Sequence, residues 1–230
     1  MGDLIGVGLY TAAEAGRLLR VPASKIGRWL RGHTIGNKHY PPLWQSQVDL
    51  GDGSVVLGFR DLMEARVADA FIRQGVSAIR VRAAIQLARE VTGGDHPLST
   101  DKFRTDGREI FLRIVDTGAD GEEREHLLNL FRRQYEFKGI IDPILKTVDF
   151  GDDGNPLLWW PAGRRSNVVV DPARAFGQPI DAISSVPTVV LAAAAQLEGV
   201  EGAASAFDVP ESSVRRAVEF EATLGPRMAA

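Results

Sequence analysis

The chain has 230 residues, of which 44% are hydrophobic and 25% charged, the balance of a soluble globular protein with one large domain or two small ones. It contains no cysteine, which excludes disulfides, thiolate metal sites and a cysteine nucleophile, and it has no apolar run of about 18 residues that could cross a membrane. An acid, Asp3, stands where a signal peptide would carry basic residues, so we expect a cytoplasmic protein.

The formal net charge of −3 is unevenly distributed. Residues 1–93 carry 12 Lys and Arg against 8 Asp and Glu, whereas residues 94–230 carry 15 against 22. No acid lies between Glu14 and Asp49, a stretch that holds six cations and two histidines: Arg17, Arg20, Lys25, Arg28, Arg31, Lys38, His33 and His39. A locally basic segment on an acidic chain favours contact with a polyanion, although a solvated positive face is the alternative.

Two short helices are predicted at the start of this segment. Thr11 and Glu14 have the spacing of a capping box, which predicts a helix over residues 12–20 with Ala15, Leu18 and Leu19 inward. Val21-Pro22 ends it, because proline disfavours helical geometry in the preceding residue. A second helix runs from Ala23 or Ser24 to about Arg31, ends near Gly32, and turns Ile26, Trp29 and Leu30 inward.

The outer face of the second helix carries Ser24, Arg28 and Arg31 at positions i, i+4 and i+7, with Lys25 beside them. Two helices joined by a tight turn, the second with a basic stripe, are typical of a helix-turn-helix with a recognition helix. The candidate DNA-binding residues are Arg17, Ser24, Lys25, Arg28, Arg31, Lys38 and His39.

A hairpin is predicted next. Residues 43–50 have strand character, Gly51-Asp52-Gly53 can form a turn, and residues 54–57 return, which together would make a wing. A helix over residues 59–74 follows, with Met63, Val67, Ala70 and Phe71 on one face. Gly75 ends it, and Ser77 can cap a further helix to about Val91 with Val81, Ala84, Ile85 and Ala88 inward.

This order of elements resembles the MerR family of winged-helix DNA-binding domains. The residues that carry the resemblance are Tyr10-Thr11-Ala12-Ala13-Glu14-Ala15, the Val21-Pro22 turn, Ile26, Trp29 and Phe59-Arg60-Asp61-Leu62. The resemblance covers residues 8–92 and implies a DNA-binding domain over residues 1–93. A purely structural helical domain is the alternative.

Residues 94–164 are predicted to be a linking region that follows a break at Gly93-Gly94-Asp95-His96-Pro97. Residues 109–115 alternate like a strand, and residues 122–137 are predicted to be helical, with a seam of Leu127, Leu130, Phe131 and Gln134. Residues 144–150 and 157–160 form a second predicted hairpin. Its acidic turn at 151–155 lacks the ligand spacing of a calcium loop, which favours a plain polar turn.

Residues 165–230 are predicted to be a separate interaction domain. Residues 168–170 form a strand, and helices are expected over residues 188–198, 202–207 and 212–224, the last with Val214, Ala217, Val218 and Leu224 inward. This unit resembles a compact antitoxin domain of the VapB type, found beside toxins of the PIN-like ribonuclease fold. The resemblance covers residues 166–224. It is carried by Val170-Asp171-Pro172, Phe176-Gly177-Gln178-Pro179, Val186-Pro187, Val214, Ala217 and Phe220, and Ile183-Ser184-Ser185 replaces the family's usual Gly-Thr-Arg.

The sequence therefore predicts a mainly α fold with small β-hairpins, in the α+β class. The two resemblances imply an antitoxin that represses its own operon as a homodimer on double-stranded operator DNA and neutralises a PIN-like toxin. Charge disfavours the C-terminal unit as the DNA reader, because Glu211, Glu219 and Glu221 offset Arg215 and Arg216. Aromatic residues dominate interface hot spots, so the candidate partner-binding residues are Trp159, Trp160, Phe176 and Phe220.

The rival hypothesis is a MerR-like regulator whose middle region senses a small molecule in a pocket lined by Trp159, Trp160 and Tyr135. Enzymatic activity, a metal and a cofactor are not expected. Gly6-Val7-Gly8 lacks the preceding strand and third glycine of a dinucleotide site, and the four histidines do not pair with carboxylates at metal-ligand spacing.

Overall fold

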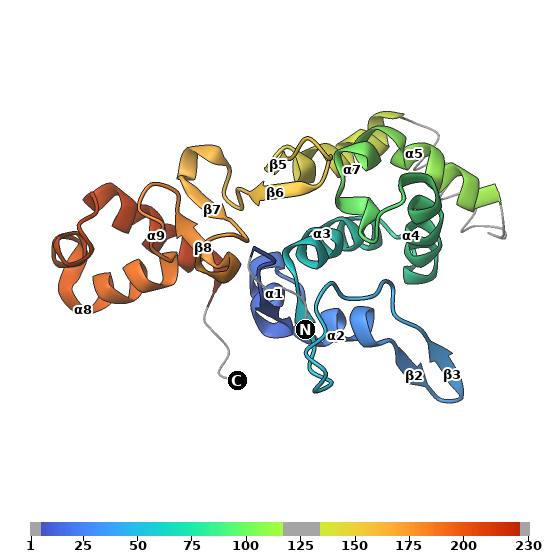
Figure 1. The fold of residues 1–230 in the computed structure, drawn as a ribbon, viewed down its shortest axis with the longest axis horizontal. Helices are drawn as coiled ribbons and strands as arrows, with labels where there is room; N and C mark the ends of the chain where they lie inside the picture. The colour runs from blue at the N-terminus through green and yellow to red at the C-terminus, as the bar shows by residue number, and fades with distance from the viewer. Residues whose placement is uncertain (1–5, 117–133, 226–230) are drawn as a thin grey trace.

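The computed structural model describes residues 6–116 and 134–225, and its fold is mixed α+β, as predicted (Figure 1). Helices α8 and α9 form one end of the molecule, and α4 and α5 the other, with α1 and α3 between them. The α-helices are α1 (Ala12–Leu19), α2 (Ala23–Arg31), α3 (Phe59–Arg73), α4 (Ala78–Thr92), α5 (Asp101–Asp116), α7 (Gln134–Leu145), α8 (Thr188–Phe207) and α9 (Glu211–Leu224). The strands are β1 (Tyr10–Thr11), β2 (His33–Ile35), β3 (Lys38–Tyr40), β4 (Val56–Leu57), β5 (Val148–Phe150), β6 (Pro156–Trp159), β7 (Val168–Val170) and β8 (Pro179–Asp181).

Helices α1 and α2 begin and end as the sequence predicts. The capping box is present: the amide of Glu14 donates to Thr11 Oγ1 over 3.2 Å, and the amide of Thr11 donates to Glu14 Oε2 over 2.9 Å. Helix α1 ends in a left-handed residue, Arg20, and α2 starts directly after Pro22. Ile26 and Trp29 of α2 are buried, so the predicted inward face of this helix is confirmed.

The predicted hairpin over residues 43–57 is wrong. Only Val56–Leu57 of that stretch forms a strand, β4, which pairs with β1. The hairpin lies earlier in the chain, where β2 and β3 pair antiparallel with Ile35 opposite Lys38. Gly36-Asn37 forms its two-residue turn, with a φ of 57° at Gly36, a conformation that glycine adopts without steric cost. Residues 43–55 instead form an irregular loop that buries Leu43, Trp44 and Val48.

The predicted strand over residues 109–115 is also wrong, because these residues belong to α5. Phe103, Ile110 and Phe111 of α5 are buried at positions i, i+7 and i+8, which is one face of a helix. They pack against α3 and α7: the ring centroid of Phe71 lies 4.4 Å from that of Phe111 and 5.9 Å from that of Phe137. The helices predicted over 59–74 and 77–91 are confirmed as α3 and α4.

The second predicted hairpin is confirmed in shorter bounds as β5 and β6, with Val148 opposite Trp159. These strands belong to an antiparallel sheet of order β5-β6-β7-β8. Residues 144–145 end α7 instead of starting a strand. Most of the helix predicted over 122–137, with Leu127, Leu130 and Phe131, lies outside the described residues.

Two hydrophobic clusters hold the described parts together. The larger cluster joins residues from Tyr10 to Val170, and it includes Leu98, which follows the predicted break at 93–97. The smaller cluster holds α8 and α9 together and comprises Leu191, Ala203, Ala204, Val209, Val214 and Ala217. Helix α8 breaks at Gly199, where φ is 76°, which agrees with the two helices predicted there. Val218 is 37% exposed, so its predicted inward position on α9 is wrong.

Candidate nucleic-acid interface

The outer face of α2 is the basic surface that the sequence predicts. Ser24, Arg28 and Arg31 are all exposed on this helix. Arg28 forms no ion pair with any residue that the structure describes, and its charge is therefore uncompensated by the protein. Arg31 donates to the carbonyl of Gly53 in the 43–55 loop, which holds the last turn of α2 beside that loop.

Lys25 lies at the edge of this face and points towards the protein core. Its Nζ is 2.9 Å from Asp69 Oδ1 on α3 and 5.0 Å from the centroid of the Trp29 ring. Asp69 also pairs with Arg73, four residues later on α3. Lys25 therefore fastens the first turn of α2 to α3, and much of its charge is compensated.

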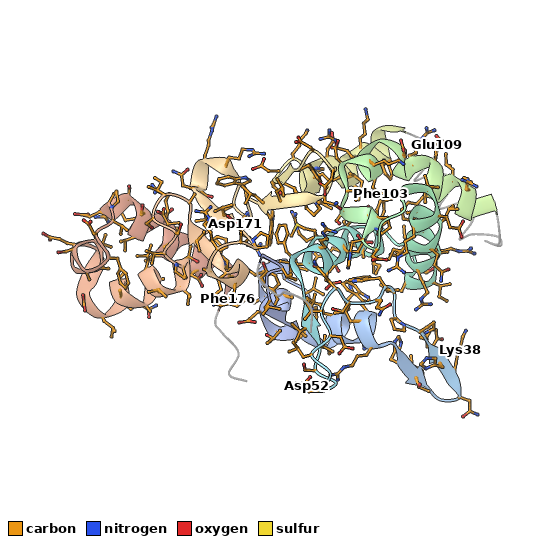
Figure 2. The ribbon with its side chains drawn as sticks, in the orientation of Figure 1. Lys38, Asp52, Phe103, Glu109, Asp171 and Phe176 are labelled. Atoms are coloured by element: carbon orange, nitrogen blue, oxygen red, sulfur yellow. The ribbon has the colours of Figure 1, made fainter. Side chains whose placement is uncertain are left out.

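The β2–β3 hairpin extends the basic surface beyond the end of α2 (Figure 2). Lys38 and His39 are exposed on β3, and Lys38 Nζ lies 5.2 Å from the centroid of the Tyr40 ring. His33 on β2 stacks on Tyr40 with the ring centroids 4.9 Å apart. Ile35 at the tip is 64% exposed. The hairpin thus presents a lysine, a histidine and one apolar side chain on a short two-stranded ribbon.

Contacts from α2 and α4 fix where the hairpin leaves the protein. The amide of Leu43 donates to the carbonyl of Trp29 over 2.7 Å. Arg82 on α4 donates from Nε to the carbonyl of Pro42 over 2.9 Å and from Nη2 to the carbonyl of Pro41. Gly32, between α2 and β2, has a φ of 72°, and a Cβ there would lie 2.4 Å from the carbonyl oxygen of Tyr40. Helix α2 and the hairpin are therefore held in one arrangement.

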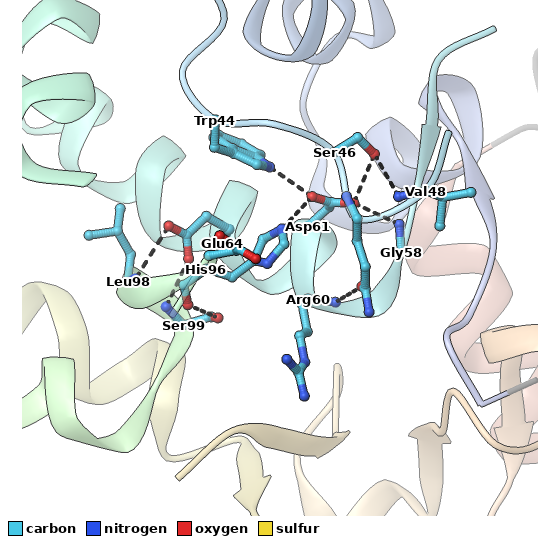
Figure 3. Close-up of polar contacts among 12 residues, drawn as sticks. Trp44, Ser46, Val48, Gly58, Arg60, Asp61, Glu64, His96, Leu98 and Ser99 are labelled. Atoms are coloured by element: carbon cyan, nitrogen blue, oxygen red, sulfur yellow. Dashed lines mark hydrogen bonds and ion pairs between the residues drawn. The ribbon is translucent and has the colours of Figure 1, made fainter. Parts of the chain in front are cut away.

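A buried carboxylate on α3 anchors the loop that follows the hairpin (Figure 3). Asp61 is 0% exposed and accepts hydrogen bonds from the indole of Trp44 over 2.8 Å and from the amides of Gln47 and Gly58 over 2.9 Å each. Ser46 Oγ and His96 Nε2 lie 3.1 and 2.7 Å from its oxygens. The Asp61 carboxylate thus accepts hydrogen bonds from Trp44, Ser46 and Gln47 at the start of the 43–55 loop.

Glu64 lies one turn further along α3 and is equally buried. Its carboxylate accepts from the amides of Leu98 and Ser99, over 3.3 and 3.0 Å. Burial raises the pKa of Glu64 to about 7, although these two amides and the nearby His96 act in the opposite direction. The stretch predicted as a linker-like break is therefore held in the core by Asp61 and Glu64.

Arg17, the first of the predicted DNA-binding residues, lies apart from the others. Its Nη2 is 2.8 Å from Glu221 Oε2 on α9, and Nε and Nη2 donate to the carbonyl of Gly225 over 3.2 and 3.1 Å. Arg20 donates to the carbonyl of Thr223 over 3.2 Å. Arg17 of α1 and Arg20 directly after it thus cap the C-terminal end of α9, where the helix dipole favours cations.

The four predicted partner-binding aromatics lie in different environments. Trp159 and Phe220 are each only 4% exposed, because they pack in the core, so a partner cannot reach their rings in this conformation. Trp160 is half-buried, and its indole donates to Asp149 over 2.7 Å. Phe176 is 73% exposed, and its φ of 54° is an uncommon value for a bulky residue (Figure 2).

The backbone around Phe176 is tied to the N-terminal segment. Its carbonyl accepts from the amide of Leu9 over 3.0 Å, and the next carbonyl, of Gly177, accepts from the Tyr10 hydroxyl over 2.8 Å. Burial raises the pKa of Tyr10, with Asp171 and Glu14 adding to the effect, so this phenol stays protonated. A groove of about 770 Å³ runs beside these contacts, between α1 and α9, and Arg17 and Glu221 are among its lining residues.

Comparison with known proteins identifies one relative by sequence and one by structure, each covering most of this chain. The chain is 31% identical over 185 residues to a Mycobacterium tuberculosis protein named "Putative antitoxin VapB45", and the match covers 76% of this chain and 77% of that protein. This chain belongs to the VapB45 family. The crystal structure of Rv2018 from M. tuberculosis has the same fold, with a TM-score of 0.73 and 27% identity over 93% of this chain and 99% of that one. No family model matches the sequence.

The hairpin beside α2 was not among the elements predicted from the sequence, although a signal for it is present. Gly36-Asn37 is a dipeptide that favours two-residue hairpin turns, and short runs with strand propensity flank it. The stronger Gly51-Asp52-Gly53 signal drew the prediction to the wrong loop. Among the described residues, no helix is long and apolar enough to span a membrane, and no three acidic or histidine side chains gather as a metal site would require.

Proposed function

We propose that this protein is an antitoxin that represses its own operon and neutralises a PIN-like ribonuclease toxin. Its membership of the VapB45 family is the observation that carries the antitoxin role. The exposed cations Arg28 and Lys38, which form no ion pair with any residue that the structure describes, support the DNA-binding role. We infer no chemistry for this chain, because cleavage of RNA belongs to the toxin in such a pair.

We propose that α1, α2 and the β2–β3 hairpin form a MerR-like winged helix-turn-helix, with α2 as the recognition helix and the hairpin as the wing. Arg28 and Arg31 would contact base edges in the major groove, where arginine pairs with guanine. Ser24 at the start of α2 and Lys38 and His39 on the wing would contact phosphates. Lys25 would act from its contact with Asp69, by holding the recognition helix in place.

We propose that the C-terminal part, with α8, α9 and the β7–β8 strands, binds the toxin. Residues 94–230 carry 15 basic against 22 acidic side chains, and an RNA-binding groove on a ribonuclease is expected to be basic, so opposite charges would speed the encounter. Phe176 is the anchor that we favour, because its exposed ring stands on a backbone fastened on both sides.

We also propose that the protein binds DNA as a two-fold homodimer in the cytoplasm. One recognition helix covers few base pairs, and helix-turn-helix dimers read inverted half-sites about one helical turn, roughly 34 Å, apart. The C-terminal unit and the segment at 122–137 are the proposed contacts between copies.

The DNA-binding role is tested with the double variant Arg28→Ala, Arg31→Ala and a fragment of the protein's own promoter. Each bidentate contact to a guanine edge is worth about 1–3 kcal/mol, so we expect binding to weaken by at least tenfold. Arg165→Ala is a matched control, since Arg165 is exposed but lies outside the proposed DNA reader, which we define as α1, α2 and the β2–β3 hairpin. Unchanged gel shifts of the double variant would show that α2 is not the recognition helix.

The toxin-binding role is tested by co-expression of the full chain with the product of the neighbouring gene. We expect the wild type to copurify with that product and relieve its growth inhibition, and Phe176→Ala to weaken both effects. Leu157→Ala is the control, because Leu157 is 52% exposed on β6, away from the Phe176 loop. A wild-type protein that folds but neither copurifies nor protects would refute the antitoxin proposal.

A further inference from the structure

Helix α8 presents an unusual surface to solvent. Its first segment, residues 188–197, contains no charged residue, and its outer face exposes Val190, Ala193 and Leu197, the last at 86%. The exposed face of a surface helix normally carries charged and polar side chains, and a helix that is apolar on all sides is normally buried. This segment lies at the outer end of the molecule (Figure 1), so no other described element covers its outer face.

One other side of this segment packs against the protein. Leu191 and Ala192 are buried, and Leu191 belongs to the cluster that joins α8 to α9. Val189 lines the groove beside α1. The outer apolar face is defined here as Val190, Ala193, Ala194 and Leu197. Among the described residues it is the least covered side of the segment, with Ala194 at its edge packed in part against the α8–α9 cluster.

The pattern of this outer apolar face is symmetric about its centre. Large side chains, Val190 and Leu197, stand about 10 Å apart at its two ends, and the small Ala193 and Ala194 lie between them. In an antiparallel pair of such helices, Val190 of one copy meets Leu197 of the other, and alanine meets alanine at the two-fold axis. A two-fold interface requires this self-complementarity, because the same patch serves on both sides.

The distribution of charge also favours a second copy of this chain as the partner of the outer apolar face. Residues 165–225 carry 4 arginines against 8 acidic side chains, so two copies of this unit have the same net negative charge and repel each other. The segment 188–197 has no charge with which to repel a second copy. A basic partner would gain more from the acidic faces than from this neutral one.

We propose that the outer apolar face of α8 packs antiparallel against the same face of a second copy, and so forms the central contact of the homodimer. This inference rests on the dimer in the proposed function and assigns its surface. The helices approach closely through Ala193 and Ala194, and each Leu197 is buried against the partner copy.

The test uses the absence of cysteine from the chain, which lets one introduced thiol report on one position. Ala193→Cys lies at the proposed two-fold axis, so mild oxidation of the full-length variant should give a disulfide-linked dimer. A disulfide requires Cα atoms roughly 4.4–6.8 Å apart, which random encounters do not sustain. Ser212→Cys, exposed at the start of α9, is the control and should stay largely uncrosslinked.

Light scattering supplies the second measurement. The wild type should have twice the chain mass of 25.0 kDa at micromolar concentration. Leu197→Glu should raise the dissociation constant of the dimer by about 100-fold, because it buries an unpaired charge in the interface. Leu157→Glu on β6 should remain dimeric, and circular dichroism checks that both variants are folded.

Several results would overturn the proposal. They are a monomeric wild type, a dimer that persists in Leu197→Glu, or a dimer in which Cys at 193 does not crosslink. If the copurified toxin protects that thiol from maleimide while the protein alone is monomeric, the toxin occupies this face instead. Loss of the proposed function is separable, because a dimer that crosslinks at 193 yet binds neither promoter nor toxin would refute the function and keep the interface.

Discussion

Asp61 and Glu64 are two buried acidic residues on adjacent turns of α3, and they bind different segments of the chain. Asp61 accepts hydrogen bonds from a loop that would otherwise bury unpaired amides, whereas Glu64 ties residues 98–99 to α3. A carboxyl group is tolerated in the core when its oxygens have hydrogen-bond partners. The two residues hold the loop at 43–55 and residues 96–99 against α3, although neither side chain faces the proposed DNA.

Glu64 makes the stability of the protein depend on pH. Its pKa in the folded protein, about 7, lies above the ordinary value of 4.5, so folding favours the protonated form. The stabilisation is fully present below about pH 4.5 and is lost as the pH rises through about 7. We expect the free energy of unfolding, measured in urea, to fall between pH 5 and pH 8.

The control for this prediction is Glu64→Gln, which cannot titrate. His96 and Asp61 also face this part of the core, so the comparison of the two proteins, and not the slope of either, isolates Glu64. The fall in unfolding free energy should be smaller in the variant. The same pH dependence in both proteins would show that Glu64 is not its source.

At the scale of elements, the sequence predicts α1 and α2 well, because residues at their ends have local preferences for starting or stopping a helix. The Thr11–Glu14 capping box and Pro22 each act within one turn, so their effect is visible without tertiary contacts. Residues 109–115 were wrongly predicted as a strand because their structure depends on tertiary contacts. Their alternation fits a strand, but burial against Phe71 and Phe137 selects the helical face of Phe103, Ile110 and Phe111.

The junction between α2 and the hairpin gives a prediction at this scale. A Cβ at Gly32 would lie 2.4 Å from the carbonyl oxygen of Tyr40, and the φ of 72° disfavours any other residue. Gly32→Ala should therefore destabilise the protein by about 1–3 kcal/mol and weaken promoter binding, because the wing moves relative to α2. Thermal unfolding and gel shifts measure the two effects.

Gly27→Ala is the matched control on the same helix. A Cβ at Gly27 meets no atom within 4 Å, and alanine is favoured over glycine in a helix interior, so this variant should be stabilised by about 0.5–1 kcal/mol. Equal effects of the two substitutions would contradict the geometry described for Gly32.

At the scale of the whole molecule, the reader and the C-terminal unit are joined in a way that the sequence did not indicate. Arg17 and Arg20 cap α9, Glu221 Oε1 accepts from the Thr188 hydroxyl at the start of α8 over 2.6 Å, and Tyr10 donates to Gly177. These partners are separated by up to 208 residues in the chain, so no local pattern could reveal them. The basic segment was predictable from composition, but which of its cations remain free required the fold.

This joint separates the roles of Arg17 and Arg28, two cations that the sequence treats alike. The slope of log affinity for DNA against log salt reports the phosphates that a protein neutralises, and it falls by about 1 for each lost contact. Arg28 makes no ion pair within the described chain and is proposed to contact a base edge, so Arg28→Ala should weaken promoter binding. Arg17 is committed to Glu221 and Gly225, so Arg17→Ala should leave the slope unchanged.

Arg17→Ala should instead lower stability, because it removes one partner of an ion pair whose side chains are 20% and 12% exposed. A double-mutant cycle with Glu221→Ala should give a coupling of about 0.5–3 kcal/mol in urea unfolding. Arg20 provides a weaker comparison, because among the described residues its guanidinium donates to the carbonyl of Thr223 and forms no ion pair. A lowered salt slope for Arg17→Ala together with no coupling to Glu221 would place Arg17 on the DNA and not in the joint.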